Sequence, residues 1–398
     1  MSQHNSDEEI LAFLANHTYN ETMERFGISR MTIARIVKRN TKRSEYMPEK
    51  IRLAIAGIGN AASALIQGIE YYRTEKTDGV LRPTLAGYHI SDISIVAAFD
   101  VAKAKVNKPL SEAIKANELP ILVQNTPKDW DLKVQMGQIL DGVIEETKEI
   151  IDPSNDTTPV DVAKILKESG AEILLCLLPS GADEAVKYYA EQALKSGCAF
   201  INATPSEIAN NKMFAKRFQD AGLPLIGDDL QDQFGGTIVQ KLLLQLMRNR
   251  GLKIKESYAL DVGGGAESLN TIHRARDVKR TIKSMSVSAA LNVDAPIVSG
   301  TSDYVPHLKN DRNSFLWLVG KGFLGSEVIM DIKIQTSDGP NGGSVLADVI
   351  RATKVALNQG ASGPVDSVSA YGFKRPPCGA KNPDEAERML ANFILGNI

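Results

Sequence analysis

Cysteine is scarce in this sequence, and long apolar runs are missing. Three cysteines stand far apart among 398 residues, with no CxxC pair, which excludes a disulfide framework and a cysteine-based metal site. No apolar run reaches the about 18 residues that a membrane helix needs. The polar, acidic N-terminus lacks the apolar segment of a signal peptide. We therefore expect a cytoplasmic protein without a membrane partner.

The sequence also has no excess of positive or negative charge. Lys plus Arg number 46 and Asp plus Glu 48, so the formal net charge is −2. This balance excludes a basic nucleic-acid coat and a strongly acidic solvating chain. The histidines show no metal-ligand spacing, and no Ser-His-Asp order indicates a hydrolase. Ordinary globular composition and this length predict two or three domains.

The N-terminal residues predict three short helices, over 7–15, 18–26 and 30–39, with a sharp turn at Gly27 before the third. This order is typical of a helix-turn-helix unit. Residues 25–43 carry seven Lys or Arg and no acid, as contact with nucleic-acid phosphates requires. Two interpretations stay open: DNA contact through this segment, or a helical appendage that packs on the rest of the chain or on a neighbouring subunit.

Beyond residue 50 the pattern becomes an alternation of buried strands and helices, which predicts a parallel sheet covered on both faces. Later strands are longer and more alternating, which suits a second, mixed sheet. The predicted strands are 51–57, 93–100, 172–178, 198–203, 223–227, 255–262 and 326–336. The predicted helices are 161–169, 182–196, 206–220, 235–247 and 344–358.

The predicted fold class is therefore α/β. It combines a Rossmann-like doubly wound parallel sheet, a second α+β domain for catalysis and oligomerisation, and a small all-α N-terminal segment. We expect these units at residues 50–235, 236–354 and 1–45, respectively. Residues 43–50 form the linker, and residues 355–398 pack back on the first sheet.

A glycine turn follows the first predicted strand. Gly57, Gly59, Asn60 and Ala61 stand between that strand and a helix, where a tight turn lets a pyrophosphate approach the helix N-terminus. The next buried strand ends in Asp100, which can bind both ribose hydroxyls and repel a 2′-phosphate, favouring NAD over NADP. Lys103 and Lys105 leave NADP open as the alternative. The spacing of roughly 40 residues exceeds the usual ~20, so an insertion must be looped out.

Polar residues also follow the three later strands of this sheet. Cofactors bind outside the carboxyl ends of parallel strands, so these residues could contact a ribose, a nicotinamide amide or a cation. Helix capping is the alternative interpretation for several of them. The residues are Pro179 and Ser180, Asn202 and Thr204, and Asp228 and Asp229.

Charged residues gather again downstream. Lys279 and Lys283 are four residues apart, so on a helix they share one face, where they could hold a phosphate or stabilise an enolate, or lie on a solvated surface. Lys374 has apolar neighbours near the C-terminus. Asp338 precedes a predicted helix and forms either a cap or the rim of an anion site.

Seven stretches together resemble the myo-inositol-1-phosphate synthase family, particularly its shorter prokaryotic branch. The resemblance begins near residue 50 and continues to the end of the chain. Its stretches are Ile55 to Glu70, Tyr88 to Asp100, Leu110 to Ile114, Phe200 to Ala209, Ile226 to Gln233, Ser337 to Ile350 and Ser369 to Pro377.

The resemblance implies an NAD-dependent isomerase-cyclase that converts glucose 6-phosphate to 1L-myo-inositol 1-phosphate. The implied steps are oxidation at C5, enolisation, intramolecular aldol closure and re-reduction, so no net oxidation occurs. A homotetramer and a monovalent or divalent cation are also implied.

Residue roles follow from the resemblance by position. Lys279 is implied as the proton acceptor at the C5 hydroxyl, with a pKa lowered by burial near other cations. Lys283 and Lys374 are implied to stabilise the phosphate or an oxyanion, and Asp228 joins them as a catalytic residue. The implied cofactor-binding residues are Gly57, Gly59, Asn60, Ala61, Asp100, Pro179, Ser180, Asn202, Thr204, Asp229 and Asp338. The implied substrate-binding residues are Asn270, Gly264 and Asn341.

The sequence departs from the family pattern at three places. An Asn is missing from Gly265-Ala266-Glu267, Asn313 stands where the family has a lysine, and the Asp-Ser-Pro-Asn-Ser pattern reads Asp338 to Gly342 with two glycines. Losing a cation would weaken transition-state stabilisation. Two alternatives therefore stay open: a related NAD-dependent enzyme for another phosphorylated sugar, or a helix-turn-helix regulator with an enzyme-like sensor domain.

Overall fold

A computed structural model describes residues 10, 13–14, 19–29, 32–33, 49–74, 77–123, 128–292 and 294–396. Its larger sheet has seven strands in the order β13-β8-β7-β6-β1-β4-β5, and every neighbouring pair is parallel. The strands are β1 (Ile51–Ala56), β4 (Ile93–Asp100), β5 (Gln135–Met136), β6 (Ile173–Cys176), β7 (Ala199–Asn202), β8 (Pro224–Ile226) and β13 (Gly363–Pro364). Because the chain moves outward in both directions from β1, the predicted doubly wound sheet is confirmed.

Helices cover both faces of this sheet, because its apolar strands bury side chains on both sides. On one face Ile51, Leu53 and Ile55 join the first core cluster, and on the other Ala54 and Ala56 join the second. The first face is covered by α4 (Asn60–Tyr71), α13 (Asp338–Asn358), α14 (Asp366–Gly372) and α15 (Pro383–Ile394). The second is covered by α7 (Val162–Glu168), α8 (Asp183–Ser196) and α9 (Lys212–Asp220).

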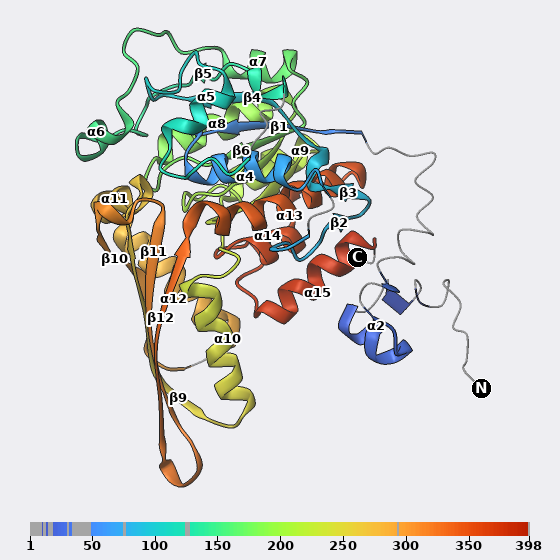
Figure 1. Cartoon of the computed structure of the whole chain (residues 1–398), viewed down its shortest axis with the longest axis vertical. Coiled ribbons are helices and arrows are strands. Elements are labelled where there is room, and N and C mark those ends of the chain that lie inside the picture. The colour runs from blue at the N-terminus through green and yellow to red at the C-terminus, as the bar shows by residue number, and fades with distance from the viewer. Residues whose placement is uncertain are drawn as a thin grey trace.

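The second sheet has four strands in the order β10-β9-β11-β12 and is mixed, as expected. It extends away from the first sheet, with α10 and α12 beside it (Figure 1). Its strands are β9 (Lys253–Gly263), β10 (Ile297–Tyr304), β11 (Asp311–Lys321) and β12 (Glu327–Ser337). Its helices are α10 (Gly236–Asn249), α11 (Ala266–Asn270) and α12 (Arg276–Leu291), with a π-helical turn at Thr271–Ala275 between the last two.

Short elements make up the connections. The insertion after α4 contains a hairpin of β2 (Thr84–Leu85) and β3 (Tyr88–His89), and the later connections contain α5 (Leu110–Ala113) and α6 (Lys148–Ile151). No helix in the described ranges is long and apolar enough to span a membrane.

Two helices begin several residues away from the predicted start, whereas the other predicted helix boundaries within the described residues differ by at most two residues. The helix expected from residue 206 begins at Lys212, because the backbone N–H groups of residues 208–210 bind the buried Asp228 carboxylate instead. The helix expected from residue 344 begins at Asp338, because proline is tolerated in the first turn of a helix. Since α13 packs in the core of the larger sheet, we propose ending the second domain near Ser337 rather than at residue 354.

The cap of α9 gives a stability prediction. The Asn211 side chain accepts hydrogen bonds from Met213 N–H (3.0 Å) and Phe214 N–H (3.2 Å). Replacing Asn211 by alanine should therefore lower the free energy of unfolding by about 1 kcal/mol, measured by urea denaturation. Lys212→Ala, at an exposed position one residue on, is the matched control and should change it little. Equal losses in both variants would contradict the capping role.

The N-terminal segment is described only in part. α2 (Tyr19–Phe26) and the turn at Gly27 (φ +62°) agree with the predicted second helix and turn. Ser29 Oγ accepts from Thr32 N–H at 3.1 Å, as a residue before a helix does. The first predicted helix is described only at Ile10, Phe13 and Leu14, and most of the third, with its basic residues, lies outside the described residues. DNA contact through residues 25–43 therefore stays a prediction.

Candidate functional site

The glycine turn after β1 has the form that a pyrophosphate needs. Gly57 has φ +92°, and a Cβ there would lie 2.7 Å from the Leu177 carbonyl oxygen, so only glycine fits. Gly59 precedes α4 without any side-chain cap, and a Cβ on it would meet no atom within 4 Å. No side chain therefore caps the N-terminus of α4, space is open beside Gly59, and Ala61 is half-buried in the first turn.

Asp100 and Asn60 fix this turn. Asp100 Oδ2 accepts from Ile58 N–H at 2.8 Å, and its Oδ1 accepts from the next two backbone amides. Asn60 Oδ1 accepts from Glu118 N–H (3.1 Å) and Leu119 N–H (3.3 Å), which holds that segment beside the turn. The structure thus brings Gly57, Gly59, Asn60 and Asp100 together, as predicted.

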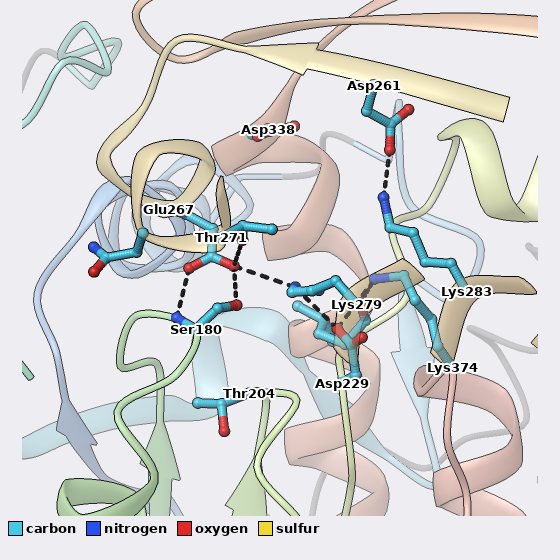
Figure 2. Close-up of polar contacts among 12 residues, drawn as sticks. Ser180, Thr204, Asp229, Asp261, Glu267, Thr271, Lys279, Lys283, Asp338 and Lys374 are labelled. Carbon is cyan, nitrogen blue, oxygen red and sulfur yellow. Dashed lines mark hydrogen bonds and ion pairs between the residues drawn. The ribbon is translucent and has the colours of Figure 1, made fainter. Parts of the chain in front are cut away.

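The three predicted lysines converge near the carboxyl ends of the sheet (Figure 2). Lys279 and Lys283 both come from α12, and Lys374 comes from the segment after α14. The ammonium groups of Lys279 and Lys374 each lie 3.3 Å from Asp229 Oδ1. Lys283 donates to Asp261, a residue of β9. All three lysine side chains are at most 12% exposed, so these charges interact with little screening by water.

Glu267 joins the lysines to the predicted cofactor side. Its Oε1 lies 3.2 Å from Lys279 Nζ, and its Oε2 accepts from Ser180 N–H at 2.9 Å. Ser180 Oγ and Thr271 Oγ1 also donate to Glu267. One carboxylate from the second domain therefore bridges Lys279 and the loop after β6.

The pKa shifts of the lysines differ in sign. Burial by itself would lower the pKa of Lys279, but the carboxylates of Asp229 and Glu267 outweigh it and raise that pKa above its usual value. Burial lowers the pKa of Lys283, although Asp261 opposes this. Burial would raise the pKa of Asp229, but Lys279 and Lys374 lower it. The expectation of a lowered pKa is therefore wrong for Lys279, whereas Lys283, for which no shift was predicted, has the lowered pKa.

Asp338 lies in a second group of charges, in which Asp261 is buried and Arg312 and Asp338 are partly exposed. Arg312 donates to Asp338 Oδ2 from Nε (3.0 Å) and Nη2 (2.6 Å), and its Nη1 lies 3.8 Å from Asp261 Oδ2. Ser314 Oγ donates to Asp261 Oδ1 at 2.6 Å. Asp261 therefore links Lys283 to Arg312 and Asp338.

Asp228 and Asp229 have different surroundings despite their adjacency. Asp228 accepts hydrogen bonds from Asn202, from Asn210 and from the backbone N–H groups of residues 208–210, so it fixes a loop. Burial raises the pKa of Asp228 to about 6. Asn202 also accepts from Thr204 Oγ1 at 2.8 Å. The geometry favours Asp229, rather than Asp228, as the carboxylate that acts with the lysines.

The predicted substrate residues are only partly free for a ligand. Asn341 exchanges two 2.8 Å hydrogen bonds with the backbone of Phe234, so it positions that loop. A Cβ on Gly264 would lie 2.2 Å from Lys309 N, so this glycine allows a close chain approach. Asn270 is fully buried, and its Oδ1 has no partner. Pro179 is half-buried beside Ser180.

Three buried oxygen atoms of the site have no hydrogen-bond partner. They are Asp229 Oδ2, Asn270 Oδ1 and Asp338 Oδ1. Because a buried unpaired acceptor is costly, they indicate that a polar ligand completes the site. Across the described residues, no group of three His, Cys, Asp or Glu side chains has metal-binding geometry.

Asn313 does not remove a charge from the lysine cluster. In β11, Arg312 and Ser314 face Asp261, and strand side chains alternate, so Asn313 points to the opposite face of the sheet. The missing family lysine therefore leaves no gap among Lys279, Lys283 and Lys374.

Sequence reasoning missed Asp261, Glu267, Arg312 and the buried Lys241 described below. Asp261 is an acid in an otherwise alternating apolar strand, which was a usable signal. Glu267 lies in the segment that departs from the family pattern, and nothing in its spacing indicated a bond to Ser180. Contacts between two domains cannot be read from a single segment.

Comparisons with known proteins identify relatives along most of the chain. A family model described as myo-inositol-1-phosphate synthase matches residues 235–339. An inositol-3-phosphate synthase of Mycolicibacterium smegmatis is 38% identical over 365 residues, which cover 89% of this chain and 100% of the relative. One of Corynebacterium glutamicum is 37% identical over 361 residues, covering 87% and 98%.

Solved structures agree in fold. The crystal structure of Ari2 is 33% identical with a TM-score of 0.70, covering 87% of this chain and 99% of that one. A myo-inositol-1-phosphate synthase-related protein from Thermotoga maritima is 22% identical with a TM-score of 0.72, covering 87% and 98%.

Proposed function

This chain belongs to the myo-inositol-1-phosphate synthase family, and from that membership we propose that it converts glucose 6-phosphate to 1L-myo-inositol 1-phosphate with NAD. The proposal depends mainly on one observation: the ammonium groups of Lys279 and Lys374 both contact the buried Asp229 carboxylate. The oxygen atoms without a hydrogen-bond partner, Asp229 Oδ2, Asn270 Oδ1 and Asp338 Oδ1, belong to the same site and can accept from a polar ligand. A buried cluster of cations is what a reaction through an enolate and an aldol closure requires.

The residues present fit NAD. The uncapped N-terminus of α4 with open space over Gly59 suits the pyrophosphate, and Asp100 at the end of β4 suits a ribose. We propose that Ser180 and Asp338 line the nicotinamide end, where Asp338 Oδ1 has no partner in the protein. When bound, NAD would supply the hydride acceptor for C5 of the sugar, and its reduced form would supply the hydride for the final reduction.

Each of the three lysines has a different proposed role in the reaction of the sugar. We propose that Lys279, kept charged by Asp229 and Glu267, stabilises negative charge on the C5 oxygen. Lys283 Nζ, whose pKa burial lowers, is the better proton acceptor, which revises the role implied for Lys279. Lys374 stabilises the phosphate or the aldehyde oxygen. Burial of all three excludes water from the enolate.

A homotetramer is part of the proposal. The face of the second sheet that points away from α10 and α12 exposes large apolar side chains, including Tyr258, Phe315 and Ile329. Soluble chains normally cover a patch of this kind, and pairing of sheets from two subunits would do so.

The proposed activity has a direct test. The purified chain is incubated with glucose 6-phosphate and NAD at several cation conditions, and the products are identified by mass spectrometry and ³¹P NMR. Inositol phosphate without accumulation of NADH is the expected result. Absence of inositol phosphate in every condition would refute the proposal and favour another phosphorylated sugar.

Replacing Glu267 by glutamine should move the alkaline limit of kcat to lower pH by about one unit. The carboxylate stabilises the Lys279 ammonium, so its loss lowers the pKa of Lys279, and the charged form disappears at a lower pH. Because the wild-type pKa of Lys279 lies above the usual 10.5, steady-state kinetics are measured from pH 8 to about 11.5, with folding checked at each pH. Glu146→Gln, which changes a half-exposed carboxylate outside the cluster, is the control. An unchanged profile in Glu267→Gln would show that the Lys279 charge does not limit turnover.

A further inference from the structure

A fourth lysine lies beside the proposed active site and has an unusual environment. Lys241 is on α10 and is 3% exposed. Its Nζ donates to Gln231 Oε1 at 2.9 Å, and no carboxylate among the described residues lies within 4.0 Å of it. Lys279, Lys283 and Lys374 each have an acidic partner. Lys241 is therefore a buried amine without a counter-charge.

The lysine is connected to the active site through Lys374 and Gln231. Gln231 follows Asp229 by two residues, and its N–H donates to Gly372 O at 2.8 Å. Lys374 donates to Leu230 O and to Asp229, so both lysines meet the same loop. The positive charge of Lys374 repels that of Lys241 and so lowers the pKa of Lys241. Two neighbouring amines thus face one short segment of the site.

The other charged groups around α10 are engaged elsewhere. Asp261 of β9, Lys283 of α12 and Arg312 of β11 interact with one another. Asp384 of α15 accepts a hydrogen bond from Gln245. The negative charge of Asp232, in the nearby loop, raises the pKa of Arg312 and of Asp338. None of these groups neutralises Lys241.

Burial and the Lys374 charge lower the pKa of Lys241 to about 7. Near neutral pH the amine is therefore part neutral and part charged. If a dianion bound between Lys241 and Lys374, the attraction of each amine to the dianion would outweigh the repulsion between the two amines. The charged form of both would then be favoured. The sugar phosphate of the proposed reaction is such a dianion.

We propose that Lys241 is a phosphate-recognising residue of the substrate site, which takes up a proton when the phosphate group of the sugar binds between it and Lys374. The proposal rests on the proposed function for the identity of the sugar phosphate. It explains why a lysine without an acidic partner is kept inside the protein next to a second cation. It also makes substrate affinity depend on pH in the range where Lys241 titrates.

Calorimetry tests the proton uptake. Glucose 6-phosphate and, separately, inorganic phosphate are titrated into the full chain with NAD at pH 7.5, in two buffers of different ionisation enthalpy. With glucose 6-phosphate, which is already almost fully dianionic at this pH, the wild type should take up roughly half a proton or more per ligand bound. Inorganic phosphate, part of which is monoanionic at pH 7.5, should show a smaller net uptake because it loses a proton on binding. Lys241→Met should lose this uptake and bind each ligand about tenfold more weakly. Lys241→Arg, whose charge is permanent, should bind phosphate but take up no proton.

Controls separate this inference from general damage and from the proposed function. Lys253→Met, at an exposed position, should behave as the wild type, and thermal unfolding with NAD titration shows whether Lys241→Met stays folded. Equal proton uptake and affinity in the wild type and Lys241→Met would overturn the inference, even if inositol phosphate forms. Lys241-dependent phosphate binding without inositol phosphate would support it while the proposed function fails.

Discussion

Replacing Lys279 by alanine should reduce kcat for inositol phosphate formation by about 10³-fold while NAD binding is retained. Lys279 is the cation that two carboxylates, Asp229 and Glu267, hold charged inside the site. Removing one preorganised donor from a developing oxyanion typically costs about 10²–10³ in kcat. The loss should appear in kcat rather than in KM, because the interaction strengthens as negative charge develops.

Single-turnover and steady-state assays measure this effect. Arg276→Ala, one turn earlier on α12 at an exposed position, is the matched control and should keep nearly full activity. Thermal unfolding and NAD titration show whether Lys279→Ala is folded. A folded variant that retains more than about a third of kcat would contradict the role given to Lys279.

Replacing Gly57 by alanine should weaken NAD binding by at least about tenfold. The new Cβ would lie 2.7 Å from the Leu177 carbonyl oxygen, and the backbone has φ +92°, so the turn must move away from its position before α4. Fluorescence titration with NAD, corrected for the folded fraction, measures the effect. The turn holds the proposed pyrophosphate site, so activity at saturating sugar phosphate should fall with it.

Gly197→Ala provides the control for backbone strain alone. Gly197 also has positive φ (+80°), but a Cβ there would meet no atom within 4 Å. It ends α8, away from the turn. We expect a modest loss of stability and unchanged NAD affinity. Equal NAD affinities in the two variants would show that the turn after β1 does not bind the cofactor.

Much of the larger sheet could be predicted from the sequence. The strand ending in Asp100 begins and ends where it was expected, at Ile93 and Asp100, because an apolar run buried on both faces is unambiguous. The start of α9 could not be predicted, since it depends on a carboxylate some 18 residues later that captures the backbone N–H groups of residues 208–210. Such long-range contacts leave no local pattern.

In the candidate site, too, local features could be predicted from the sequence and long-range contacts could not. The shared face of Lys279 and Lys283 follows from helical spacing and is confirmed. The sign of the Lys279 pKa shift could not be predicted, because it depends on Asp229 from the first sheet and Glu267 from the second domain. Likewise, adjacent Asp228 and Asp229 look equivalent in the sequence, yet one fixes a loop and the other meets two lysines.

The most direct test of the account follows a single atom. Glucose 6-phosphate deuterated at C5 is incubated with the purified chain and unlabelled NAD, and the product is analysed by NMR and mass spectrometry. We predict inositol 1-phosphate that retains the deuterium at the carbon derived from C5, with no label accumulating in the free nucleotide. Inositol phosphate without the deuterium, or no inositol phosphate while the sugar phosphate is consumed, would contradict the account.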